Sequence, residues 1–207
     1  MPWILDTVAG RVAADISGFW SEFGARESKI TSPWVAPEDG PGPLNVRLDS
    51  APRQLPEYTA LVSHLIFVGA TARSLLDAQA PGSCRFTETL VTMPSGRPYE
   101  RPVFLLTLLE GALVADGIVT DRSDVRRVEG QFVLAPDGRR LPLPPRLAAT
   151  RQPPQLTWSR AAVGDRAIWA DAMLRDRIIA SDALYAAFKA AGVSGFQAQE
   201  CRFATEH

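Results

Sequence analysis

The chain has 207 residues, a formal net charge of −1 and a sequence pI near 6.1. This balance provides no overall field that would attract nucleic acid or an anionic membrane surface, so we expect neither as a partner. The length suffices for one sizeable core. We predict a single domain over residues 1–207, in which the proline-rich part, about residues 1–58, is either integral or a loosely attached subregion.

The first part of the chain has few regular patterns. Trp3 to Leu5 predict a short strand. Apolar residues recur at helical spacing from Val12 to Phe23, but nearby glycines weaken the pattern, so this segment is predicted to be helical or irregular. Prolines from Pro33 to Pro56 remove amide donors, which predicts a surface loop or a sheet edge, interrupted by a brief strand at Leu44–Leu48.

A strand-helix-strand unit is predicted next. Leu65–Val68 is an apolar strand, and Thr71 is placed to cap the helix that follows. Pro81 and Gly82 end this helix before another strand starts at Cys84.

The middle of the chain favours antiparallel strands. Val103–Val114 is long enough for a helix, so its assignment stays open between helix and strand. Val128–Leu134 and the turn at Asp137-Gly138 are typical of a hairpin. A second proline-rich loop is predicted over Pro142–Pro154.

The last thirty residues contain the most complete local pattern. Ile178-Ile179 end a short strand, and Ser181 is placed to cap a helix with one apolar stripe. Gly192 provides a left-handed residue just past the last turn, and Gly195 frees the backbone before Phe196 begins an extended run. We therefore predict a second strand-helix-strand unit here.

These elements together predict an α+β fold. Its sheet is mixed or largely antiparallel, and its helices are few and short. Trp158, Ile168 and Trp169 flank a strand or short helix between the second proline-rich loop and the final unit.

The cysteines and the chain start bear on the compartment. Cys84 and Cys201 are each followed by Arg-Phe, so neighbouring strands joined by a disulfide are one interpretation. Free, buried thiols are the simpler interpretation in a chain without a secretory signal. The start has no basic region followed by a long apolar run, and no later stretch reaches the roughly 18 apolar residues of a spanning helix. We expect a soluble, cytoplasmic protein.

Residue types that support catalysis are scarce. His64 lies in an apolar run and His207 at the terminus, so a histidine relay or a multi-histidine metal site would need one or both of them. The phosphate-binding GxxxxGK[ST], strand-linked GxGxxG and GxSxG patterns are missing from the sequence. Two separated cysteines exclude a cysteine-rich zinc site. We expect no metal site and no cofactor.

Acidic residues are concentrated in one stretch, mixed with Arg122, Arg126 and Arg127. They are Glu110, Asp116, Asp121, Asp124 and Glu129. Paired carboxylates bind Mg²⁺ or act as acid and base, so a small metal-dependent enzyme is one interpretation. The spacing matches no specific motif, and a solvated hairpin rim is the simpler interpretation.

Tryptophan and arginine near loops suit a protein interface, where large flat side chains and forked donors dominate the binding energy. The candidates are Trp34, Trp158, Arg160 and Trp169. Ordinary anchoring in the core is the alternative, above all for Trp169.

Three blocks of the sequence together resemble a known family. They read "LIFVGATARSLLDAQAPGSCRF", "ALVADGIVTDRSDVRRVEG" and "IIASDALYAAFKAAGVSGFQAQECRF". They resemble the eleventh numbered family of bacterial immunity proteins from polymorphic toxin systems, formerly a domain of unknown function. That family ends on a Ser-capped helix and a GxxGF-like step, here Gly192 to Phe196. It also carries an acidic residue before an Asp-x-Ser element, here Asp116 before Asp121, Arg122 and Ser123.

The resemblance implies a non-enzymatic protein that neutralises a toxin. The toxin would be secreted by a type VI or Rhs-type system, and its C-terminal domain would be the partner. A nuclease or an NAD-using toxin such as an ADP-ribosyltransferase fits, because carboxylates around Asp116 to Asp124 imitate phosphate. The expected toxin-binding residues are Asp116, Asp121, Arg122, Asp124, Trp158 and Arg160. The other interpretations are the metal-dependent enzyme and an adaptor or chaperone that holds an effector without blocking it.

Overall fold

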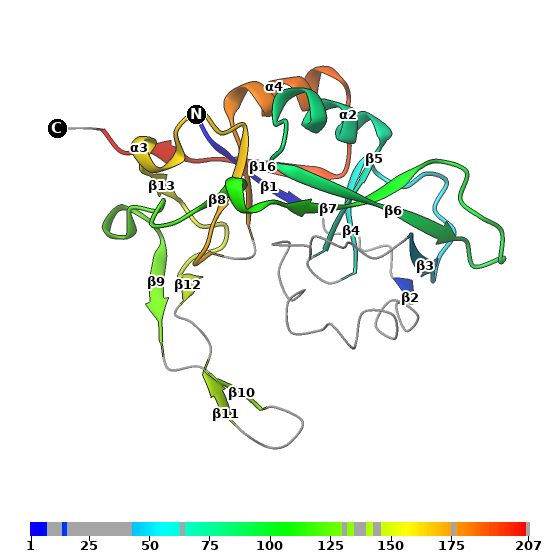
Figure 1. Cartoon of the computed structure of the whole chain (residues 1–207), viewed down its shortest axis with the longest axis horizontal. Coiled ribbons are helices and arrows are strands. Elements are labelled where there is room, and N and C mark those ends of the chain that lie inside the picture. The colour runs from blue at the N-terminus through cyan, green and yellow to red at the C-terminus, as the bar shows by residue number, and fades with distance from the viewer. Residues whose placement is uncertain are drawn as a thin grey trace.

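A computed structural model shows a mixed α+β fold, which confirms the predicted fold class. The structure describes residues 1–7, 14–15, 43–62, 65–129, 132–134, 140–142, 146–174 and 177–205. Within them the strands form two larger sheets and three short ribbons, and helices lie along one side (Figure 1). Most strand pairs are antiparallel, as the turn patterns of the sequence indicate.

The first larger sheet brings the chain start together with the chain end. In order across the sheet its strands are β16 (Phe196–Glu200), β1 (Trp3–Thr7), β15 (Ile178–Ala180), β14 (Ile168–Asp171) and β8 (Leu113–Val114). The predicted first strand is therefore confirmed, and it is paired on both sides. Only β14 and β8 run parallel.

The second larger sheet contains the middle of the chain. Its order is β2 (Ala14–Asp15), β3 (Leu44–Leu48), β6 (Cys84–Thr92), β7 (Val103–Leu108), β5 (Leu65–Gly69) and β4 (Tyr58–Val62). The brief strand predicted at Leu44–Leu48 is confirmed. Its burial alternates, since Leu44, Val46 and Leu48 point into the core and the residues between them are exposed.

The short ribbons belong to the hairpin region and the chain end. They pair β9 (Val125–Val128) with β12 (Arg146–Ala149), β10 (Phe132–Leu134) with β11 (Arg140–Pro142), and β13 (Thr157–Trp158) with β17 (Arg202–Phe203). The antiparallel β10–β11 pair agrees with the predicted hairpin, whose turn at residues 135–139 lies outside the described residues.

Three assignments differ from the sequence prediction or refine it. Val103–Val114 is strand β7, then a 3-10 turn at Glu110–Ala112, then β8, and β7 is a strand because it pairs with β5 on one side and β6 on the other. The proline-rich loop at Pro142–Pro154 contains β12, which lies between its prolines. Ala14–Asp15 is a strand and not helical, while the rest of Val12–Phe23 lies outside the described residues.

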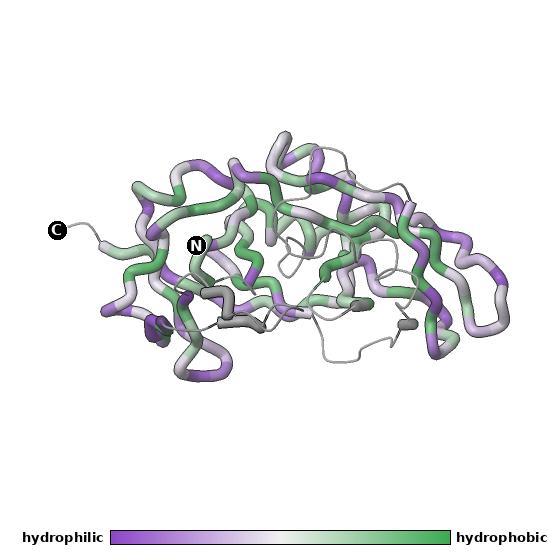
Figure 2. The backbone as a smooth tube through the Cα atoms, turned by 60° about the horizontal axis from the view of Figure 1, so that its bottom comes forward, coloured by the Kyte–Doolittle hydropathy of each residue, from purple (hydrophilic) through white to green (hydrophobic). Residues whose placement is uncertain are grey.

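The two sheets share one hydrophobic cluster beneath the helices. It includes Ile168 and Ala180 from one sheet, Leu106 from the other, Leu76 from helix α2 (Ala70–Gln79) and Phe188 from helix α4 (Asp182–Ala190). The two helices lie side by side over it (Figure 1). Figure 2 shows the hydrophobic stretches running through the interior strands, with hydrophilic segments at peripheral turns. Each buried Leu or Phe stabilises this core by about 1.5–3 kcal/mol.

The predicted cap and glycine stop of α4 are confirmed. The Ser181 side chain accepts a hydrogen bond from the Leu184 amide at 3.2 Å. Gly192 has φ 69° and Gly195 has φ 96°, and Phe196 begins β16. Between the glycines, the Ser194 carbonyl accepts a hydrogen bond from the Tyr58 amide at 2.9 Å, so the segment from Gly192 to Gly195 is bound to the first residue of β4.

The cap of α2 differs from the sequence prediction. The sequence predicts Thr71 as the cap. In the structure α2 begins at Ala70, and the residue at the cap position is Gly69, which has no side chain to accept a hydrogen bond. Instead, the amides of Thr71 and Ala72 donate to Oε2 of Glu57, at 3.1 and 3.3 Å. Gly69 lets the carboxylate approach, because a Cβ there would lie 2.5 Å from Glu57 Oε2. A residue distant in sequence therefore caps this helix.

We predict that Glu57→Ala lowers the free energy of unfolding by about 1 kcal/mol, because it removes the acceptor and the negative charge at the positive end of α2. Urea unfolding measures this. Thr71→Ala is the matched control and should change stability by less than about 0.5 kcal/mol. An equal loss in both variants would contradict the assignment of the cap to Glu57.

The two cysteines are free thiols, as expected, and they do not lie on neighbouring strands. Cys84 begins β6 and packs against the cluster shared by the two sheets. Cys201 lies in a separate cluster on the other side of the first sheet. Both thiols are free, and burial raises the pKa of Cys84 to about 12 and that of Cys201 to about 11. Neither thiol is ionised near neutral pH.

Among the described residues, no helix combines the length and apolar character needed to cross a membrane.

Candidate functional site

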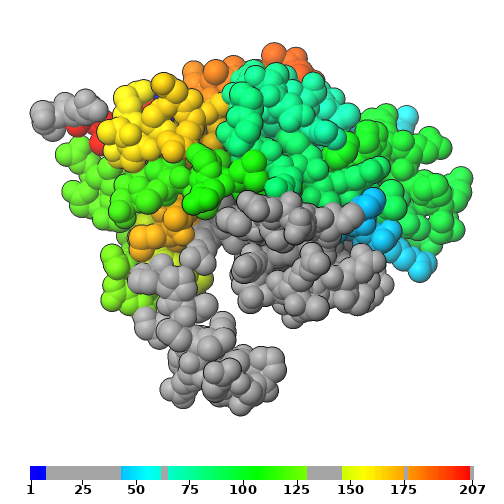
Figure 3. Space-filling model, in the orientation of Figure 1, coloured from blue at the N-terminus to red at the C-terminus, as the bar shows by residue number. Residues whose placement is uncertain are grey.

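The predicted acidic stretch forms a loop, residues 115–124, that we call the acidic loop. It contains one 3-10 turn, Thr120–Arg122, between β8 and β9. Backbone hydrogen bonds fasten it to β13: the Val119 amide donates to Thr157 O at 2.9 Å, and the Ser159 amide donates to Gly117 O at 2.8 Å. Figure 3 shows the green surface around residues 110–125 directly beside the yellow surface of helix α3 (Arg160–Val163).

Side chains add further bonds at the end of the acidic loop. The Ser123 hydroxyl donates to Val119 O at 2.8 Å and accepts from the Thr157 amide at 2.9 Å. The Thr157 hydroxyl donates to Arg122 O at 2.7 Å. Ser123, the serine of the Asp-x-Ser element, therefore holds the loop in shape.

A buried carboxylate lies beneath the loop, and the sequence analysis missed it. Asp171, at the end of β14, is 2% exposed. Its Oδ2 accepts from the Gly117 amide at 3.0 Å, and its Oδ1 accepts from the Met173 amide at 2.8 Å. Burial raises the pKa of Asp171, and the backbone amides that bond to it lower it in part. The signal in the sequence was an aspartate closing the apolar run Ile168–Asp171.

The predicted site residues separate into exposed and structural groups. Asp116, Asp121 and Arg122 are exposed on the acidic loop, and Asp116 has a left-handed backbone with φ 52°. Asp124 is half-buried, and its Oδ2 accepts from the Gln155 amide at 3.0 Å, so it supports the loop. Arg160 is exposed, with its guanidinium 4.1 Å from the centre of the Phe203 ring.

The prediction that Trp158 is an exposed contact residue is wrong. Trp158 is 0% exposed and Trp169 is 1% exposed, and their rings meet edge to face at 5.7 Å. They anchor the cluster between the first sheet and the acidic loop, because the burial of two large aromatic side chains contributes much of the stability of such a cluster. Trp34 lies outside the described residues.

The acidic residues do not converge on a metal site. Nowhere in the described ranges do three or more His, Cys, Asp or Glu side chains group as ligands, and those ranges include all five acidic residues from Glu110 to Glu129. His64 and His207 lie outside the described residues. The arrangement at the acidic loop therefore presents separate charges and not a cluster of ligands.

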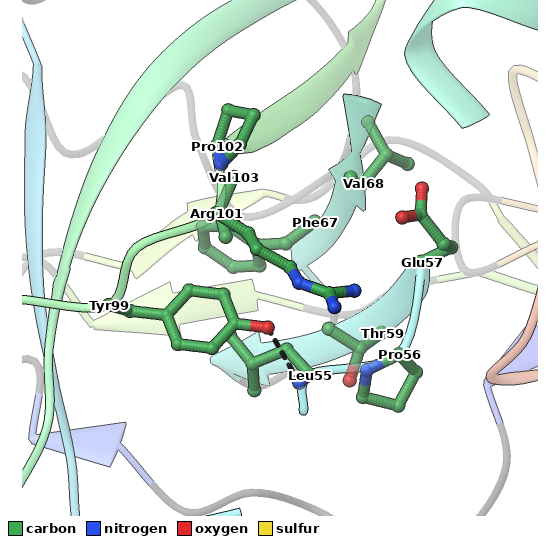
Figure 4. A pocket seen from close by; sticks show the side chains of 11 residues that line it. Leu55, Pro56, Glu57, Thr59, Phe67, Val68, Tyr99, Arg101, Pro102 and Val103 are labelled. Atoms are coloured by element: carbon green, nitrogen blue, oxygen red, sulfur yellow. Dashed lines mark hydrogen bonds between the residues drawn. The ribbon is translucent and has the colours of Figure 1, made fainter. Parts of the chain in front are cut away.

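A small pocket lies elsewhere, beside the start of α2. Its lining includes Leu55, Glu57, Tyr99 and Arg101, and the Tyr99 hydroxyl accepts from the Leu55 amide at 2.9 Å. In Figure 4 the Arg101 side chain extends past Tyr99 toward Glu57. The cavity measures about 10 Å³, which is room for about one water molecule and too small for a substrate.

No protein-family model matches the chain, and no curated protein matches its sequence. The acidic loop and its surroundings are therefore the features of the chain that bear on its function.

Proposed function

We propose that this protein is an immunity protein, which binds and neutralises a cognate secreted antibacterial toxin in the cytoplasm of the producing cell by covering the toxin's active site. The observation that carries the proposal is the acidic loop, whose exposed charges are held in a fixed arrangement by hydrogen bonds to β13 and to Asp171 at the end of β14. The resemblance of the three sequence blocks to an immunity family agrees with it.

The support is physical. A loop that must become ordered on binding loses conformational entropy, which weakens the complex. The acidic loop is already fastened by Asp171, Ser123 and Thr157, so its exposed groups meet a partner in a preset geometry. Asp116 and Asp121 form no ion pair with another described residue, and both charges are available to a partner.

The charges also indicate the partner's chemistry. Exposed carboxylates on a rigid loop complement a basic cleft, and they occupy positions that phosphate oxygens take in a nucleotide or nucleic acid. A toxin that binds nucleic acid or NAD⁺ has such a cleft. Arg122 and Arg160 would then contact the acidic rim of that cleft, as forked donors do at protein interfaces.

The test is a double charge reversal, Asp116→Lys with Asp121→Lys, in cells that also produce the toxin encoded by the adjacent upstream gene. We expect wild type to restore growth and the double variant to fail, with affinity weakened by about 100-fold in calorimetry. Glu88→Lys on β6 is the matched control, because Glu88 is exposed and lies in the other sheet.

Two outcomes would reject the proposal. One is no growth rescue and no complex with the toxin on size exclusion for the wild-type protein. The other is a complex in which the isolated toxin keeps its full activity, since an adaptor or chaperone binds an effector without blocking it.

A further inference from the structure

The β9–β12 ribbon continues directly from the acidic loop and is fixed to the body of the protein. The Thr150 amide donates to Asp124 O at 2.9 Å, and the Leu147 amide donates to Met173 O at 2.9 Å. Leu147 is buried in the cluster that also holds Trp158 and Trp169. The ribbon is therefore as rigidly placed as the acidic loop.

The outer face of this ribbon is basic. Side chains alternate between faces along a strand, so Arg126 and Val128 share one face, and their cross-strand partners Ala148 and Arg146 lie on it too. Leu147 on the opposite face is buried, which places Arg126 and Arg146 toward solvent, and both are exposed. Two guanidinium groups thus flank a small apolar strip on the outer face.

The charge of this region contrasts with the rest of the chain. Residues 125–149 contain five arginines and two acidic residues, in a chain with a formal net charge of −1. In the described part of that region, Arg127 forms an ion pair with Glu129 at 2.6 Å, whereas Arg126 and Arg146 form none. The two outer arginines are therefore available to an acidic group.

A second copy of this chain does not fit the ribbon's edge. In the described part of the chain β9 pairs with β12 alone, and no other described strand covers its second edge. The strand reads Val-Arg-Arg-Val in either direction, so antiparallel pairing of two copies would set Arg126 opposite Arg127. Like charges directly opposite one another are destabilising, and basic residues on edge strands oppose self-association. An acidic strand has the complementary charge.

We propose that the β9–β12 ribbon binds an extended acidic segment of the toxin, which lies along the edge of β9 and between Arg126 and Arg146. This inference rests on the proposed function and assigns a second part of the same contact surface. The toxin surface is then bipolar: it is basic opposite Asp116 and Asp121 and acidic opposite the ribbon. Opposite charges on neighbouring patches set the orientation of the complex and speed its formation.

The test uses the double variant Arg126→Glu with Arg146→Glu and the purified product of the adjacent upstream gene. We expect affinity to fall by about 10- to 100-fold and association to slow, with a weaker dependence on salt. Arg97→Glu is the matched control, since Arg97 is exposed on the turn between β6 and β7, and it should stay within about twofold of wild type. Circular dichroism melts verify that each variant is folded.

The outcomes separate this inference from the proposed function. Tight binding by wild type and equally tight binding by the arginine variant would overturn the ribbon's role and leave the immunity function intact. If wild type does not bind the toxin, both proposals fall. Wild-type binding to a 20-base-pair DNA duplex that the arginine variant loses would also overturn the inference, because the ribbon would then be a nucleic-acid site.

Discussion

Gly195→Ala should lower the free energy of unfolding by more than about 4 kcal/mol, although it adds only one methyl group. A Cβ at this position would lie 2.1 Å from Tyr58 O and 2.3 Å from Pro56 Cβ, and the residue has φ 96°. Backbone and a proline ring cannot move aside as a flexible side chain can. Strand β16, which follows Gly195, would have to separate from Pro56 and the start of β4, with loss of the bond from the Tyr58 amide to Ser194 O.

Gly192→Ala is the matched control for this prediction. Gly192 also has positive φ, 69°, but no atom lies within 4 Å of a Cβ built there. Gly192→Ala should therefore lower the free energy of unfolding by only about 1–2 kcal/mol, the cost of holding alanine at a positive φ. Urea unfolding of both variants separates close approach from backbone conformation. Equal losses in the two would contradict the role assigned to the contact with Pro56 and Tyr58.

Asp171→Ala should lower the free energy of unfolding by about 2–4 kcal/mol, because it leaves the Gly117 and Met173 amides without their acceptor. It should also loosen the acidic loop, and amide hydrogen exchange at residues 115–119 should accelerate. Asp165→Ala, at an exposed aspartate, is the control and should stay within about 0.5 kcal/mol of wild type. Unchanged exchange in Asp171→Ala would contradict the proposed support of the loop.

The pH dependence of Asp171 has a defined sign. Burial raises its pKa in the folded protein above the ordinary value of 3.8, so the folded state holds this proton more tightly than the unfolded state. Its contribution to stability is complete below 3.8 and is lost as pH rises through the folded pKa. Asp171→Asn removes the dependence. Urea titrations between about pH 4 and 7 measure the free energy of unfolding of each protein. The value for wild type minus the value for Asp171→Asn should decrease as pH increases.

Local patterns predicted the elements whose contacts are close in sequence. Ser181 caps the helix that begins at the next residue, through the amide of Leu184, and Gly192 and Gly195 adopt the positive φ angles that their places after the helix require. The strands at Trp3–Thr7 and Leu65–Gly69 follow from apolar runs. The exposure of Asp121 in a loop also agrees with its polar neighbours Thr120 and Arg122.

Contacts between distant segments escaped these patterns. The carboxylate of Glu57 caps α2, in place of the nearer Thr71, because the antiparallel pairing of β4 with β5 sets Glu57 beside Gly69 at the helix start. Cys84 and Cys201 share a local motif, yet they belong to different clusters, since a motif does not specify which sheet a strand joins.

The sequence by itself determined the α+β class, the strand-helix-strand unit at the chain end and the charges of the acidic loop, since these depend on residues within one or two turns of each other. Only the tertiary structure decided that Trp158 is buried and that Asp171 holds the loop from 54 residues beyond Gly117. It also placed Arg126 and Arg146 of the β9–β12 ribbon on one outer face. Burial and cross-strand pairing arise when distant segments pack together, and no local pattern contains that information.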